Sequence, residues 1–121
     1  MGLDMYLFRG GKPTEGEVMV GDWRKANMVH GFFVDECADG VDECQPISVP
    51  FEELVVLRDR CKDIMNGGIP EQLLPVKQGF FFGSYEYDEY YMMDIERTLD
   101  ILNWVVLMHS EEYEYYYQAS W

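Results

Sequence analysis

The sequence predicts a single α+β domain over residues 1–121, with a small, mainly antiparallel sheet and three helices. Three observations lead to this prediction. Short segments at the two ends of the chain alternate between apolar and polar residues, as strands do. Three longer segments between them carry apolar residues at helical spacing. The chain has 121 residues, of which 48% are hydrophobic, so it is long enough to bury one core and too short for two.

Five segments have the length and pattern of strands. They are residues 2–8, 17–20, 45–49, 79–83 and 111–118. In the first of them, Leu3, Met5 and Leu7 face one way, which predicts one buried side. The last segment is expected to pair with the first. Three phenylalanines between two glycines make the fourth segment a short buried strand.

Three helices are expected between these strands. They run from Trp23 to about Cys37, from Phe51 to Met65, and from a cap at Ser84 or Asp88 to about Met108-His109. Asp22 has the side chain to cap the first helix. Gly31 lies in the middle of that helix, which suggests that another backbone or a ligand approaches closely there. The two-proline segment 69–78 is expected to be a surface connection.

The charge is strongly negative and unevenly distributed. The formal net charge is −14, from 23 acids against 9 bases. Residues 1–34 hold four of each, so the remaining 19 acids and 5 bases lie in residues 35–121. This excess disfavours binding to nucleic acid or to an anionic membrane and favours a basic surface on a partner protein. A site for an anionic small molecule is expected in the first third of the chain.

The repeated Asp-Glu-Cys of residues 35–44 predicts an acidic surface loop. Its cysteine spacing matches no common zinc site, and its oxygen ligands do not follow a calcium loop, so neither a metal nor a cofactor is expected. The acids that we predict to bind a partner are Asp35, Glu36, Asp39, Asp42 and Glu43. Three cysteines without a leader-like segment or a membrane-length apolar run predict a reducing, cytoplasmic setting.

One stretch of the first helix combines cations, an amide, an imidazole and aromatic rings. Its candidate ligand-binding residues are Trp23, Arg24, Lys25, Asn27 and His30. At helical spacing, Trp23, Asn27 and His30 share a face, which is either a core with satisfied polar groups or the wall of a pocket. The bases favour an anion, and the rings suit a nucleotide base. The alternative is that Trp23 is a core residue and that the bases pair with neighbouring acids.

A second segment is expected to pack against this stretch. Its candidate residues are Tyr85, Tyr87, Asp88 and Glu89. The tyrosines could stack on a ligand. Either acid could orient His30 as a general base, although nothing in the sequence marks a nucleophile.

Three blocks of sequence resemble a family of small bacteriophage and prophage proteins. The blocks are Met-Gly-Leu-Asp-Met-Tyr-Leu at 1–7, Trp-Arg-Lys-Ala-Asn at 23–27 with His30 and Phe33-Val34, and Gly-Phe-Phe-Phe-Gly-Ser at 79–84 with Glu86 to Glu89. The resemblance carries no settled activity. It implies a viral origin, the cytoplasm of a host bacterium, and an accessory role against a host system.

These observations together favour a non-enzymatic protein that inhibits a host factor, such as a defence factor, through an acidic, tyrosine-rich surface. The alternative is a protein that sequesters a nucleotide or another anionic small molecule. A His-dependent enzyme is the third possibility.

Overall fold

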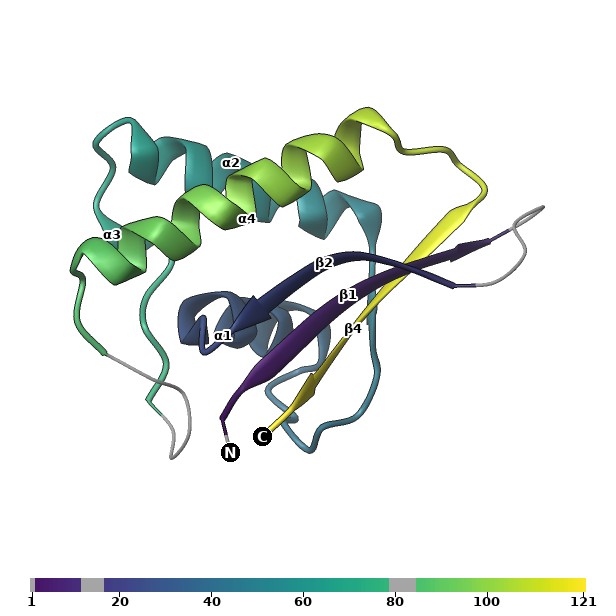
Figure 1. Ribbon diagram of the computed structural model, residues 1–121, viewed down its shortest axis with the longest axis horizontal. Helices are drawn as coiled ribbons and strands as arrows, with labels where there is room; N and C mark the ends of the chain where they lie inside the picture. The colour runs from purple at the N-terminus through teal and green to yellow at the C-terminus, as the bar shows by residue number, and fades with distance from the viewer. Residues whose placement is uncertain (1, 12–16, 79–84) are drawn as a thin grey trace.

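The computed structural model describes residues 2–11, 17–78 and 85–121 of the chain (Figure 1). The elements are β1 (Asp4–Gly11), β2 (Val18–Arg24), α1 (Asn27–Cys37), β3 (Ile47–Val49), α2 (Phe51–Met65), α3 (Pro70–Leu73), α4 (Glu89–Leu107) and β4 (Tyr113–Ser120). The four strands form one antiparallel sheet in the order β2-β1-β4-β3. The predicted α+β class with an antiparallel sheet is therefore confirmed.

The centre of the sheet is the pairing of β1 with β4, which the sequence predicted. The register runs from Asp4 opposite Ser120 to Gly11 opposite Tyr113. Every second residue of both strands is buried on one face of the sheet, because successive side chains of a strand point to opposite sides. The buried residues are Leu3, Met5 and Leu7 on the first strand and its lead-in, and Tyr115, Tyr117 and Ala119 on the last.

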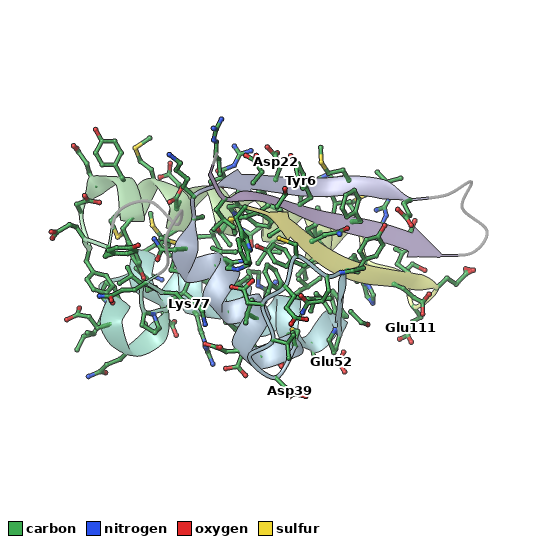
Figure 2. The ribbon with its side chains drawn as sticks, turned by 90° about the horizontal axis from the view of Figure 1, so that it is seen from below. Tyr6, Asp22, Asp39, Glu52, Lys77 and Glu111 are labelled. Atoms are coloured by element: carbon green, nitrogen blue, oxygen red, sulfur yellow. The ribbon has the colours of Figure 1, made fainter. Side chains whose placement is uncertain are left out.

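The helices cover this buried face. Helix α1 packs against the sheet, where the ring of Phe33 stacks on that of Tyr117 with centroids 4.3 Å apart. Helices α2 and α4 lie side by side next to it (Figure 1). Figure 2 shows Tyr6 and Asp22 on the opposite side of the sheet from α1. The core therefore lies between the sheet and the three longer helices, and the outer face of the sheet is open.

The two longest helices each bury an apolar stripe, as their helical spacing predicted, although Met65 at the end of α2 is exposed. Their buried residues are Leu54, Leu57, Cys61 and Ile64 on α2, and Tyr91, Ile95, Thr98, Leu102 and Val105 on α4. Burying each large apolar side chain stabilises the fold by about 1.5–3 kcal/mol. No helix in the described part of the chain is both long and apolar enough to cross a membrane.

The start of the first helix was predicted wrongly. Strand β2 continues through Trp23 and Arg24, which pair with Met5 and Asp4 on β1. Helix α1 begins only at Asn27, its N-cap residue is Ala26, and no side chain caps it. Asp22 is therefore a strand residue. Pairing with β1 outweighs the local helix-start signal, as tertiary contacts often do.

Two other boundaries bear on the site. The segment predicted as a plain connection contains the short helix α3, which Pro70 starts. Asp88 caps α4, as one of the two predicted alternatives, with Oδ1 accepting a hydrogen bond from the Tyr91 amide at 3.1 Å. The other alternative, Ser84, and the predicted strand at 79–83 lie outside the described residues.

Candidate functional site

Trp23 is a core residue and does not face a ligand. Its side chain is almost fully buried, and its indole Nε1 donates a hydrogen bond to Thr98 Oγ1 on α4 at 2.8 Å. Its ring also makes an edge contact with Phe33. Because Trp23 lies on a strand, the predicted helical face of Trp23, Asn27 and His30 does not exist.

His30 is buried and links three parts of the fold. Its Nδ1 lies 2.7 Å from the Tyr117 hydroxyl, and its Nε2 lies 2.9 Å from Asp42 Oδ1. Burial raises the pKa of Tyr117 well above its ordinary value, so the hydroxyl keeps its proton and donates it to Nδ1. Nε2–H then donates to Asp42, because an ionised carboxylate only accepts.

This arrangement anchors the fold and offers no surface for catalysis. Both His30 and Tyr117 are at most 1% exposed, so a substrate cannot reach the proton between them. Burial lowers the pKa of His30, although Asp42 opposes that shift. The prediction that Asp88 or Glu89 orients this ring is wrong, because Asp42 occupies its Nε2 and Asp88 caps α4.

Three of the predicted ligand-binding residues meet at one cavity, which we call the junction cavity. It has a volume of about 230 Å³ and lies between the β2–α1 junction and α4. Its lining residues are Arg24, Lys25, Asn27, Met28, Glu86, Tyr90, Tyr91, Met93 and Asp94. The floor is buried and formed by Asn27, Met28 and Tyr91, whereas most of the rim is exposed.

The junction cavity carries charges of both signs. Arg24 Nε lies 3.7 Å from Asp4 Oδ1, an exposed contact that contributes little. A methyl group placed on Gly2, which is not a lining residue, would lie 3.8 Å from Lys25 Nζ and 3.9 Å from Arg24 Nη2, so the two cations lie beside the start of β1 at the cavity rim. On α4, burial raises the pKa of Asp94 to about 6, although Arg97 opposes the shift.

Both walls of the junction cavity are fixed by hydrogen bonds. Arg97 on α4 donates through Nε to the Asp22 carbonyl oxygen and through Nη2 to Asp22 Oδ1, both at 2.9 Å. The Trp23–Thr98 bond joins the same two elements. Asn27 Oδ1 accepts from the Lys77 amide at 2.9 Å, which fixes the start of α1. The cavity is therefore shaped in advance of any ligand.

A larger cavity of about 440 Å³ lies on another side of α1, and its cations are already engaged. Arg60 lies over the ring of Phe32 at 5.2 Å, and Lys77 Nζ lies 3.3 Å from Asp35 Oδ1. A Cβ on Gly31 would come within 3.1 Å of the Lys77 side chain. The predicted close approach at Gly31 is thus made by a side chain, and this cavity offers less to an anion.

The predicted tyrosines do not line the junction cavity. The Tyr87 hydroxyl accepts a hydrogen bond from the Val76 amide at 3.1 Å, and its ring makes an edge contact with Tyr91. Tyr85 and Tyr87 are each 39% exposed. Glu89 is the exposed first residue of α4.

The predicted acidic loop forms part of a surface that continues onto α2. Asp35 pairs with Lys77, and Asp42 pairs with His30, so these two acids hold the loop in place. Glu36 and Glu53 both act on Cys37, whose pKa is raised to about 12 mainly by burial and then by their charges. Figure 2 shows Asp39 and Glu52 together at one edge of the molecule. We call Glu36, Asp39, Glu43, Glu52 and Glu53 the acidic surface.

The α2 part of the acidic surface lies far from Tyr85 and Tyr87. Phe51, at the start of α2, stacks on His109 with ring centroids 3.6 Å apart, and His109 follows the end of α4. The tyrosines lie at the start of α4, whose 19 residues span about 28 Å. Glu36, by contrast, lines the larger cavity together with Val76, whose amide donates to the Tyr87 hydroxyl, so the acidic, tyrosine-rich surface that the sequence suggested stays a prediction. His109 has a structural role, since its Nδ1 also lies 2.8 Å from the Tyr115 hydroxyl.

The described residues form no metal cluster, and two of the three cysteines are thiols of low reactivity. Within the ranges that the structure describes, no three His, Cys, Asp or Glu side chains gather to hold a metal ion. Cys61 is fully buried on α2, and burial raises its pKa to about 12. A thiol with such a pKa is not ionised at neutral pH and is a poor nucleophile.

Sequence reasoning missed Asp94 and the partners of His30. Asp94 lies next to the core position Ile95, and nothing in its spacing distinguishes it from the other acids of α4. Tyr117 lies far along the chain, in the last strand. No protein-family model, curated protein or solved structure matches the chain. The resemblance to phage proteins therefore stays a prediction, and function is argued from the acidic surface and the junction cavity.

Proposed function

We propose that this protein binds a basic surface of another protein through its acidic surface, without catalysing a reaction. The observation that carries the proposal is the lack of basic partners. None of Glu36, Asp39, Glu43, Glu52 and Glu53 has a basic group within 4 Å among the described residues. Repulsion among five such carboxylates opposes folding, and a basic partner would relieve it.

The loop that carries these acids is pre-organised for binding. Asp42 and Asp35 fix its position through His30 and Lys77, so less conformational entropy is lost on docking. Val41, in the same loop, is 46% exposed and supplies an apolar contact among the charges. Charge complementarity would speed association and make it sensitive to salt.

The resemblance to phage proteins suggests the class of partner. A protein of viral origin in a bacterial cytoplasm would meet host factors that carry basic surfaces, including nucleic-acid-binding proteins of defence systems. Occupying such a surface would inhibit the host factor. This role is suggested by the resemblance alone. It is the reason for using a bacterial lysate in the experiment below.

A pull-down with matched variants tests the proposal. The test variant is Glu36→Gln, Asp39→Asn, Glu43→Gln, and the control is Glu96→Gln, Asp100→Asn, Glu111→Gln, which removes the same charge from exposed acids elsewhere. We expect a bacterial host protein to be captured by the wild type and by the control but not by the test variant. The captured protein should also dissociate as salt rises. Equal capture by both variants would refute the acidic surface as the binding site.

A second candidate function is the binding of a small anion in the junction cavity. The presence of Arg24 and Lys25 in the lining of this cavity favours it, as does the start of α1 at the cavity floor. A nucleotide, which the sequence suggested, is larger than this cavity of about 230 Å³. Titration with inorganic phosphate and acetate, followed by NMR, tests this function with Arg24→Ala and Lys25→Gly as the variants that should not respond.

A further inference from the structure

We infer that the junction cavity binds a small α-amino acid, or another molecule with the same pair of charged groups. The carboxylate of the ligand would lie at Arg24 and Lys25, and its ammonium group at Asp94. This inference rests on the same site as the second candidate function and goes beyond it, since the ligand carries a positive as well as a negative group.

The two charge signs come from different walls of the junction cavity. The bases belong to the end of β2 and the turn before α1, whereas Asp94 belongs to α4 and Glu86 to the segment before it. A simple anion would be attracted by one wall and repelled by the other. A simple cation would be attracted by the acidic wall and repelled by the basic wall. A zwitterion satisfies both walls, because each of its charges meets the opposite sign.

The size of the cavity fits such a ligand. A volume of about 230 Å³ holds roughly eight water-sized groups at about 30 Å³ each. An α-amino acid with a short branched side chain, such as valine, has about this number of non-hydrogen atoms. Met28 and Tyr91 form an apolar part of the floor against which that side chain would pack.

The backbone at Lys25 has an unusual conformation. Lys25 has a φ of 57°, a conformation that is unfavourable for a residue with a side chain. Its amide donates to the Leu3 carbonyl oxygen at 2.7 Å, which fixes the turn. A glycine would adopt this φ without strain, so a lysine at this position adds conformational strain to the folded state. A binding role for its ammonium group would explain why a lysine is found here.

NMR titration with free ligands tests the inference directly. The probe is L-valine. Two analogues each lack one of its charged groups: 3-methylbutanoate lacks the amine, and isobutylamine lacks the carboxylate. We expect L-valine to bind with a Kd of about 1 mM, as suits a small ligand at an open site. Each analogue should bind at least tenfold more weakly than L-valine. The amides of Asn27 and Met28 should shift most.

Three variants separate the parts of the site. Lys25→Gly removes the ammonium group at a φ that glycine accepts, and Asp94→Asn removes the opposite charge at nearly constant shape. Each should weaken L-valine binding about tenfold. Glu96→Gln, on the same helix but outside the cavity lining, should leave it unchanged. Thermal unfolding of all three variants shows whether the fold is kept.

The outcomes distinguish this inference from the proposals above. If 3-methylbutanoate or inorganic phosphate binds as tightly as L-valine, the zwitterion is refuted and the cavity is an anion site. If none of the four probes binds, both the inference and the second candidate function are refuted. Neither result affects the acidic surface, which the pull-down tests separately.

Discussion

At the scale of single residues, His30 joins α1, the acidic loop and β4. Replacing His30 with Ala leaves the buried Tyr117 hydroxyl without this acceptor and releases Asp42. We expect the free energy of unfolding to fall by about 2–4 kcal/mol in urea denaturation. His109→Ala, which also removes a bond to a tyrosine but at a half-exposed site, should cost less. A loss below about 1 kcal/mol for His30→Ala would contradict the anchor role.

The same residue makes stability depend on pH. Burial lowers the pKa of His30 in the folded state below the ordinary value of 6.5. The unfolded chain therefore binds this proton more readily, and the stability that His30 contributes falls as pH drops below 6.5. Three charged groups act on the ring. Asp42 and Asp35 favour its protonated form, and Lys77 disfavours it. The wild type should lose more stability between pH 7.5 and 5.5 than His30→Gln does.

Asp94 acts in the opposite direction and provides an internal check. Its pKa is raised to about 6 by burial, so the folded state holds this proton more tightly than the unfolded chain. Its contribution to stability therefore grows as pH falls from about 6 toward 4. Asp94→Asn should raise the free energy of unfolding at pH 8 by about 1–3 kcal/mol. No gain at pH 8, with an unchanged fold, would mean that Asp94 is not desolvated.

The sequence indicated that His30 matters but not how. Its helical position and its mixed polar and apolar neighbours were visible in the chain. Its partners were not, because Asp42 looked like one more acid in a charged loop and Tyr117 like one of several tyrosines in a strand. Hydrogen bonds between distant segments depend on the packing of α1 against β4, which no local pattern encodes.

At the scale of elements, the hydrogen bond between Trp23 on β2 and Thr98 on α4 fixes the two walls of the junction cavity. Thr98 Oγ1 accepts from Trp23 and donates to the Asp94 carbonyl oxygen at 2.7 Å. Thr98→Val keeps the shape but removes both bonds, which leaves a buried indole N–H without an acceptor. We expect a loss of about 1–3 kcal/mol in urea denaturation. Thr98→Ser keeps the hydroxyl and should lose less, and equal losses would argue against the bond.

The elements were predicted well where one pattern extended over a whole segment. Strand β1, the stripes of α2 and α4, and the pairing of β1 with β4 all followed from alternation or helical spacing. The boundary between β2 and α1 did not. Trp23 to Ala26 suits a helix as readily as a strand, and the choice is made by β1, whose Asp4 and Met5 pair with that stretch. Predicting the site as a helical face failed for the same reason.

At the scale of the whole molecule, net charge opposes the compact state. The formal charge is −14, and the acidic surface gathers five carboxylates without nearby bases among the described residues. Salt screens such repulsion over a distance of about 8–10 Å at physiological strength. We expect the Tm to rise by a few degrees between 20 and 300 mM NaCl. The variant Glu36→Gln, Asp39→Asn, Glu43→Gln should show a smaller rise, and an equal rise would place the repulsion elsewhere.

The pairing of β1 with β4 has a consequence for the speed of folding. The hairpin of β1 and β2 can form early, because its strands are close in sequence. Residues 12–112 separate β1 from its partner on the other side, β4, so the central ladder closes only after this long intervening segment has collapsed. Such non-local closure places the protein among slower folders of its size. Until β4 pairs with β1, that side of β1 is an exposed sheet edge. Two partly folded chains can exchange their β4 strands at this edge.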